Sequence, residues 1–240
     1  MFLFYCHRLY LIGFLYLRQD SKDFSVRAER GGKVPATVVE SPVLKYYINV
    51  KIDFMSNTLE MLEVVDDNDN VVGLESREKI HKEGLLHREI HIWFITPNSE
   101  IIFQHRAKDK DTYPDKLDAT VSGHVEPEMS YDETAVKECK EETDIDIDMN
   151  KLHFLEKLSG KRFDTQTKLV NNAFRNQYIY LYEGSISDLK VEEGKAEGFE
   201  AWKIDDLSNL SDLDKNKFID AIFSQEILQI FNKAKTMLIK

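Results

Sequence analysis

Short apolar runs separated by turn-forming residues begin at Met61 and continue to the end of the chain. Their length and their bounding polar clusters are typical of strands in a mixed α/β domain. The pattern predicts strands at 61–65, 71–75, 90–96, 101–105, 119–125, 152–158, 177–182 and 199–204. The first two flank the polar run 66–70, which favours a hairpin turn.

Three segments have the pattern of helices. Residues 77–82 precede Gly84, and a glycine at this point can adopt the left-handed conformation that ends a helix. Ser130 stands three residues before Glu133, which is the capping-box spacing, and predicts a helix that runs to about Thr143. Residues 213–238 predict a terminal amphipathic helix with a break near Ser224. Its apolar side consists of Phe218, Ile222, Ile227, Ile230 and Phe231.

Residues 1–54 differ from the rest of the chain. They carry eight basic and five acidic side chains, whereas residues 55–240 carry 24 and 38. The run 1–17 is strongly apolar, but His7 and Arg8 interrupt it, so it fits neither a signal peptide nor a spanning helix well. We expect 1–54 to be an N-terminal extension and 55–240 to be the main domain. The leading hypothesis is that 1–54 precede a true start at Met55; a weak membrane anchor and an ordered extension are the alternatives.

The net charge of −11 argues against a nucleic-acid polymer as partner, because such a partner requires a basic face. Nor does the interrupted apolar run make a membrane an expected partner. Two cysteines, Cys6 and Cys139, cannot form a disulfide framework, and their spacing does not suggest zinc. A reducing cytoplasm is therefore the expected location. A homodimer is compatible with the sequence but cannot be derived from it.

The candidate chemistry lies in the predicted helix 131–143. Glu138, Glu141 and Glu142 stand at positions i, i+3 and i+4, so a helix places all three carboxylates on one face. Such a cluster also occurs on solvated surface helices. Here, however, a loop containing Gly123 and Pro127 leads into the helix, and oxygen ligands bind Mg²⁺ while offsetting mutual repulsion. The arrangement favours a site for a hard divalent cation.

The segment from Gly123 to Ile145 resembles the signature of the Nudix family, Gly-x5-Glu-x7-Arg-Glu-U-x-Glu-Glu-x-Gly-U, in which U is aliphatic. The matching residues after Gly123 are Glu138, Glu141, Glu142 and Ile145. Lys137 replaces the arginine and Cys139 occupies the first aliphatic position. Two positions depart clearly: Met129 stands where the family has its first glutamate, and Asp144 where it has its last glycine.

This resemblance implies an α/β/α sandwich with a mixed sheet and a hydrolase that cleaves a diphosphate bond in a nucleoside diphosphate-linked or other small diphosphate substrate. It implies Mg²⁺, or alternatively Mn²⁺, held by Glu138, Glu141 and Glu142. We expect Glu142 to be the chief ligand. Glu141 or Glu142 is the expected general base, with a downstream glutamate, Glu197 or Glu200, as the alternative.

Other segments look like the branch related to isopentenyl-diphosphate isomerase. By that resemblance Arg106, Lys110 and Gly123 are the expected substrate-binding residues. His87 and His124 match metal ligands of the isomerases and are candidates for a second metal site; His81 falls near a third ligand with altered spacing. For each histidine the alternative is polar packing beside a strand.

The isomerase match is incomplete. Ser122 occupies the position of the isomerases' catalytic cysteine, and the segment from Asn171 offers no Glu-x-Glu pair of metal ligands. Hydrolysis is therefore favoured. An isomerase-like enzyme is the first alternative, and a catalytically weak diphosphate-binding module is the second, because of Met129 and Asp144.

Overall fold

The computed structural model describes residues 60–110, 112–165, 167–192 and 194–237, together with three strands near the N-terminus. The chain divides into two compact units, Met1–Glu60 and Met61–Lys240. In the first unit β1 (Leu3–Phe4), β2 (Leu15–Asp20) and β3 (Asp23–Ala28) form an antiparallel sheet. Most of residues 1–54 lie outside the described residues, and their predicted origin stays a prediction.

The second unit is built on a mixed sheet whose central path has the order β10-β11-β6-β7-β12. Its strands are β6 (His87–Ile95), β7 (Glu100–Arg106), β8 (Leu117–Asp118), β9 (Val121–His124), β10 (Leu152–Phe163), β11 (Val170–Leu181) and β12 (Ala196–Lys203). β11 pairs with β6 in parallel, and the other pairs are antiparallel. β10 and β11 are longer than predicted, because they continue as an antiparallel hairpin whose register runs from Leu152 to Phe163.

β6 and β7 pair only at one end and then separate, and two short strands line the gap: β9 pairs with β6 and β8 with β7. The predicted strand 119–125 is therefore shorter than expected, since β9 covers only 121–124 and β8 lies before the predicted range. Thr120 lies at the fork, where its hydroxyl donates to the carbonyl oxygen of Ile102 and accepts from the amide of Phe94. These two bonds fix the separation of the strands, which positions the candidate site.

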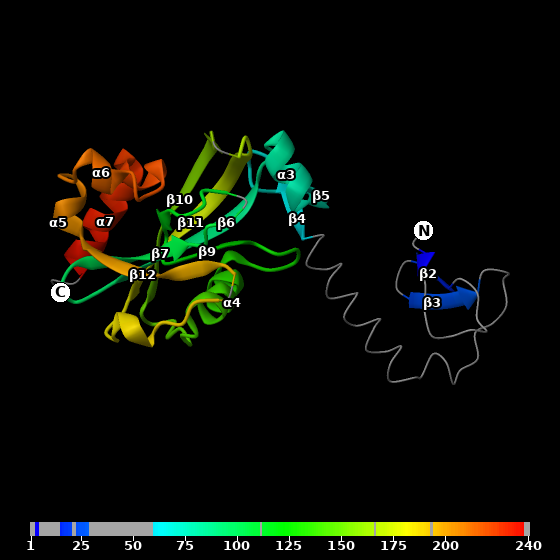
Figure 1. Ribbon diagram of the computed structural model, residues 1–240, viewed down its shortest axis with the longest axis horizontal. Helices are drawn as coiled ribbons and strands as arrows, with labels where there is room; N and C mark the ends of the chain where they lie inside the picture. The colour runs from blue at the N-terminus through cyan, green and yellow to red at the C-terminus, as the bar shows by residue number, and fades with distance from the viewer. Residues whose placement is uncertain are drawn as a thin grey trace. The chain divides into compact units, whose positions relative to one another are not determined.

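Helices cover both faces of this sheet, as predicted for an α/β/α sandwich. Alternate residues of β6 face opposite sides: Trp93 and Ile95 belong to one apolar cluster, Ile92 and Phe94 to the other. The first cluster is covered by α7 (Gln225–Met237) and the second by α4 (Tyr131–Thr143). Figure 1 shows α4 and α7 on opposite sides of the strands.

Two helix boundaries agree with the sequence predictions. α3 (Arg77–Glu83) ends at Gly84, which is left-handed with φ of 68°. α4 begins at a complete capping box between Ser130 and Glu133 and ends at Thr143. Among the described residues, no helix is both long and apolar enough to cross a lipid bilayer.

The predicted terminal helix 213–238 is wrong for its first half. The break near Ser224 is present, but α6 (Asp212–Lys215) and the 3₁₀ turn η2 (Asp220–Phe223) replace a continuous helix. The reason is pairing with β8: the amide of Leu117 donates to Lys217 O at 2.7 Å, and the amide of Ile219 donates to Leu117 O at 3.1 Å. Two further short turns, η1 (Ile186–Asp188) and α5 (Ile204–Leu207), flank β12.

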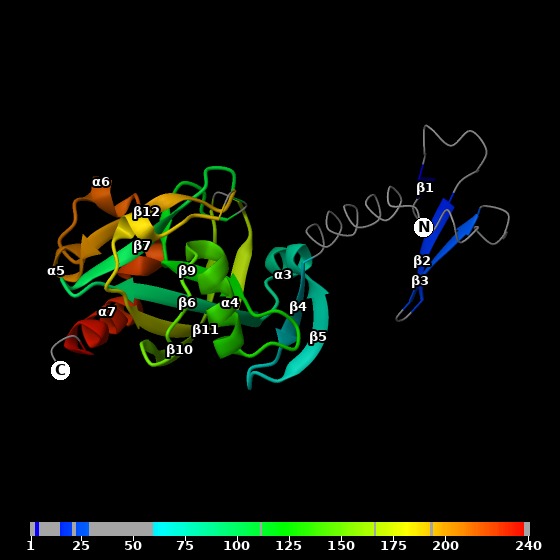
Figure 2. The same ribbon diagram turned by 90° about the horizontal axis from the view of Figure 1, so that it is seen from below.

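The predicted hairpin is formed by β4 (Met61–Val65) and β5 (Val71–Ser76). With α3 it lies at one end of this unit, opposite α5, α6 and α7 (Figures 1 and 2). Its turn is held by Asp69, whose carboxylate lies 2.6 Å from Arg88 Nε and 2.6 Å from Lys157 Nζ. This ion-pair group fixes the hairpin, and therefore α3, against the main sheet.

Gly84→Ala is expected to destabilise the protein by roughly 1–3 kcal/mol. The added Cβ would lie 2.8 Å from Val170 Cγ1 and would occupy a left-handed conformation. Gly160→Ala is the control, because its Cβ would meet nothing within 4 Å; it should change stability by no more than about 0.5 kcal/mol. Urea unfolding followed by circular dichroism measures both, and equal effects would contradict the assignment.

Candidate active site

A carboxylate from α4 enters the fork between β6 and β7, where it contacts β7 and the short strand β9 that lines the gap. Glu142 Oε2 accepts from the backbone amide of Ser122 and from the side-chain amide of Gln104, each at 3.2 Å. Only 4% of Glu142 is exposed. β7 and β9 of the sheet therefore hold a buried carboxylate that belongs to helix α4.

Glu138, one turn earlier on α4, lies directly over Gly123 of β9. A Cβ at residue 123 would approach Glu138 Cδ to 2.5 Å. The backbone at this position must therefore lack a side chain for the helix and strand to come this close. Gly123 was predicted to bind substrate, which stays a prediction; in the structure it makes room for Glu138.

Two buried carboxylates side by side make this region electrostatically unfavourable without a cation. Burial and, after it, the neighbouring charge of Glu138 raise the pKa of Glu142 to about 8, although Lys195 opposes the shift. Burial also raises the pKa of Glu138, while Lys195 and Lys137 oppose it. Lys195 Nζ lies 4.0 Å from Glu138 Oε2 and 4.0 Å from Glu142 Oε1.

Lys137, at the position of the family's arginine, lies among three carboxylates. Its Nζ lies 2.9 Å from Glu126, 3.0 Å from Glu141 and 3.5 Å from Glu138. Burial opposes the charge, but hydrogen bonds to Glu126 and Glu141 raise the pKa of Lys137. Glu138 and Glu142 lie together, whereas Glu141 is turned outward, with 45% of its side chain exposed.

The two departures from the family pattern have structural explanations. Met129 is partly buried and packs against the apolar cluster beneath α4, where the family's carboxylate would be unfavourable. Asp144 adopts the left-handed conformation of the absent glycine, with φ of 59°. Its carboxylate is held by Lys140 and Lys190, so the helix still ends at the expected residue.

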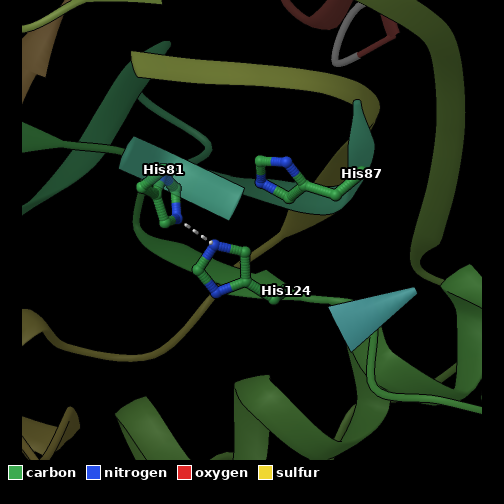
Figure 3. A group of neighbouring side chains, drawn as sticks. All are labelled: His81, His87 and His124. Carbon is green, nitrogen blue, oxygen red and sulfur yellow. Dashed lines mark hydrogen bonds between the residues drawn. The ribbon is translucent and has the colours of Figure 1, made fainter. Parts of the chain in front are cut away.

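Three histidines from separate elements converge on the other face of β9. His81 comes from α3, His87 from the start of β6 and His124 from the end of β9 (Figure 3). One ring nitrogen of each lies within 4.8 Å of the others, and Nε2 of His81 is 3.0 Å from Nε2 of His124.

The ring of His87 is oriented toward this cluster. Its Nδ1 is 3.1 Å from Leu85 O, so it donates there and leaves a lone pair on Nε2. That Nε2 atom is buried without a hydrogen-bond partner. Burial, with smaller contributions from the neighbouring histidines, lowers the pKa of His81 to about 4. A neutral ring at pH 7 is the form that binds metals.

Glu89 adds a carboxylate to the histidine cluster. Its Oε1 lies 3.5 Å from Nε2 of both His87 and His124, and its Oε2 lies 2.6 Å from Arg175 Nε. Although Glu89 is fully buried, Arg175 holds its pKa well below its usual range. Asn171, in the segment that lacks the isomerases' acidic pair, donates to Glu89 Oε1 at 2.8 Å. The histidine cluster therefore has a neighbouring carboxylate from β6, although the segment from Asn171 offers none.

The other predicted site residues are placed as follows. Arg106 is engaged within the protein: its guanidinium donates to Thr112 O and to Asp118. Lys110 is half-buried in the following loop. Glu200 lies on the side of β12 opposite α4, because its neighbours Phe199 and Ala201 pack in the α4 cluster. Glu197 is exposed near a bulge in β12.

The structure brings five further residues into these sites that were not predicted from the sequence: Glu89, Gln104, Glu126, Arg175 and Lys195. Glu126 stands within the family signature, three residues after Gly123, which was a usable signal. Gln104 and Lys195 lie far from α4 in sequence, and only the packing of β7 and of the loop before β12 brings them near it.

Comparison with known families decides the assignment. A model of the NUDIX domain family matches residues 85–226 of this chain, which is more than half of its length. The chain belongs to the Nudix family. Family membership makes it a hydrolase of diphosphate bonds. The matched range includes both groups of candidate residues except His81.

Individual relatives support the same family. A Nudix hydrolase of Clostridium acetobutylicum without an assigned activity is 30% identical over 169 residues, covering 69% of this chain and 79% of the relative. An isopentenyl-diphosphate Delta-isomerase of Serratia proteamaculans is 25% identical over 153 residues, covering 64% and 80%. The matches to some other Nudix hydrolases span about half of the relatives' own length.

The fold of the Nudix domain has a solved counterpart. The crystal structure of DR0079 from Deinococcus radiodurans superposes with a TM-score of 0.53 and 19% identity, covering 72% of this chain and 98% of that one. At this identity the likeness concerns the fold alone. It agrees with the sandwich predicted from the sequence.

The raised pKa of Glu142 predicts that the metal-free protein loses stability as the pH rises from 4.5 to about 8. In this range the unfolded chain has released the proton while the folded protein still holds it, so rising pH favours unfolding. Glu142→Gln removes the titrating group and should flatten the profile. Thermal unfolding in a chelator at several pH values measures this, with Glu226→Gln, an exposed glutamate in α7, as control. Superimposable profiles for wild type and Glu142→Gln would refute the prediction.

Proposed function

We propose that this Nudix protein is a Mg²⁺-dependent hydrolase that cleaves a diphosphate bond in a nucleoside diphosphate-linked or other small diphosphate compound in the cytoplasm. Mn²⁺ is the alternative cation. The observation that carries the proposal is the burial of Glu138 and Glu142 side by side at the fork, with two lysines as their nearest cations.

The residues present fit a hard divalent cation. Glu138 and Glu142 offer carboxylate oxygens, which Mg²⁺ and Mn²⁺ prefer, and their repulsion decreases when a cation binds between them. Glu141 would complete the set by turning inward from Lys137. A bound Mg²⁺ would neutralise diphosphate charge and acidify a bound water.

The side chains of the site have three further roles: metal ligation, proton acceptance and contact with the diphosphate. Ser122 and Gln104 fix one oxygen of Glu142, which suits it to be the chief ligand. Glu141 reaches solvent, and its carboxylate can accept the proton of an attacking water; Glu142 is the other candidate base. Arg106 and Lys110 are proposed to contact the diphosphate, for which Arg106 would exchange Thr112 O for a phosphate oxygen.

A second candidate function is an isomerase-like reaction, and the histidine cluster is the observation that favours it. His81, His87, His124 and Glu89 form a donor set suited to a transition metal. Ser122 in place of a cysteine and Asn171 in place of an acidic ligand argue against the reaction itself. We therefore propose the cluster as a second metal site in a hydrolase. A weak binding module without turnover is the third alternative.

Purified protein with Mg²⁺ is expected to release phosphate-containing products from at least one compound in a panel of nucleoside diphosphate derivatives and isopentenyl diphosphate. Glu142→Gln should reduce the rate by roughly 100-fold or more, because it removes a charged ligand or base. Glu226→Gln should retain full activity. Product analysis by phosphorus NMR measures both the cleavage and its position.

The same panel separates the alternatives. Conversion of isopentenyl diphosphate to its allylic isomer would establish the isomerase function instead of hydrolysis. Tight binding of a panel compound without any product would establish the binding module. Hydrolysis that survives Glu142→Gln would refute the proposed site.

His87→Ala is expected to lower the affinity for Zn²⁺ or Mn²⁺ at the histidine cluster by roughly 10-fold or more. Its Nε2 atom carries the available lone pair, and Glu89 and His124 alone cannot replace it. Metal content after dialysis, measured by plasma mass spectrometry, tests this. His153→Ala, an exposed histidine on β10, is the control; equal metal loss in both variants, or none, would show that the cluster is only polar packing.

A further inference from the structure

Lys195 is the residue whose position the proposed reaction leaves unexplained. Its ammonium is equidistant, at 4.0 Å, from one oxygen of Glu138 and one of Glu142. It also lies 2.8 Å from Glu192. A lysine ammonium with three carboxylates around it is a cation at neutral pH.

A cation between these two carboxylates occupies the electrostatic position of a metal ion. A divalent cation that binds the same oxygens must repel the ammonium, because both carry positive charge within a few ångströms. This repulsion favours an ammonium that leaves the two carboxylates when the metal binds.

We propose that Lys195 is a displaceable counter-ion, which neutralises Glu138 and Glu142 in the metal-free protein and passes to the substrate's diphosphate when the divalent cation binds. The proposal rests on the proposed function, since it takes the glutamates to be the metal site. It adds a residue that sets metal affinity and contacts the substrate.

The backbone at Lys195 keeps the displaced ammonium close to the site. Its carbonyl oxygen accepts from the amide of Ala107 at 3.1 Å, and its amide donates to Glu192 O at 3.0 Å. These bonds tie the residue to the end of β7, so only the side chain is free to turn. One-third of that side chain is exposed, which leaves it room to move toward solvent.

A diphosphate on the metal is the anion that would attract this side chain. It brings negative charge to the mouth of the same site, and charge-assisted hydrogen bonds from an ammonium to phosphate oxygens are strong. Glu192 can hold the Lys195 ammonium between these two positions, because at 2.8 Å it is a closer partner of Lys195 than Glu138 or Glu142. Lys195 thus changes from a competitor of the metal to a ligand of the substrate.

The test uses Mn²⁺ alone and then inorganic pyrophosphate with saturating Mn²⁺, both titrated calorimetrically into the full-length protein. Lys195→Met should bind Mn²⁺ about 10-fold more tightly, because the competing cation is gone. It should bind pyrophosphate about 10-fold more weakly, because a charged donor is lost. Lys195→Gln should give the same pair of changes, and Lys195→Arg should keep both affinities near wild type.

Lys190→Met is the matched control. It removes one positive charge from the same connecting segment, but Lys190 pairs with Asp144 rather than with the glutamates. It should change neither affinity. A uniform effect of net charge would shift Lys190→Met and Lys195→Met alike and would overturn the proposal.

The two changes of opposite sign distinguish the proposal from a structural role. Unchanged or weaker Mn²⁺ binding in the Lys195→Met and Lys195→Gln variants would overturn it, as would unchanged pyrophosphate binding. Glu142→Gln tests the proposed metal site separately from the role of Lys195. If this variant binds Mn²⁺ like wild type, the proposed metal site is wrong and Lys195 loses its role with it; if it loses Mn²⁺ binding, the Lys195 variants test the counter-ion alone.

Discussion

Two carboxylates buried next to each other repel, and the arrangement of this domain around Glu138 and Glu142 reflects that repulsion. Burial removes the water that would otherwise screen them, so their charges must be met by protons or cations. In the metal-free protein Lys195 and Lys137 lie nearest, and protonation of Glu142 near neutral pH supplies the rest. A site of this kind stores unfavourable energy that cation binding releases.

The backbone around the fork holds Glu138 and Glu142 close together. Thr120 holds β6 and β7 apart. Ser122 on β9 and Gln104 on β7 donate hydrogen bonds to Glu142, and Gly123 leaves room for Glu138. The same short strand, β9, presents His124 to its other face. One strand therefore links the carboxylate site and the histidine cluster, which lie on its opposite sides.

The strands, the capping box and the end of α4 follow from local chemistry, which is why the sequence alone predicts them. The shortening of the strand predicted at 119–125 and the interruption of the terminal helix do not, because both depend on hydrogen bonds to distant segments: Thr120 to Ile102, and Leu117 with Lys217 and Ile219. Tertiary hydrogen bonds override a periodic apolar pattern there.

The candidate site divides in the same way. Helical spacing places Glu138 and Glu142 on one face, and family resemblance points to His87 and His124. Lys195 and Glu89 carry no such signal, since their importance arises from where the loop before β12 and the start of β6 lie in space. Charge compensation in a buried site is a property of the folded protein and cannot be read from spacing.

The measurement that tests the central claim most directly is the position of a bound cation. Anomalous diffraction from crystals soaked in Mn²⁺ locates that ion without reference to activity. The account predicts a peak about 2.0–2.2 Å from carboxylate oxygens of Glu138 and Glu142, with the Lys195 ammonium moved away from them. A peak only at His81, His87 and His124, with Lys195 still between the glutamates, would contradict it.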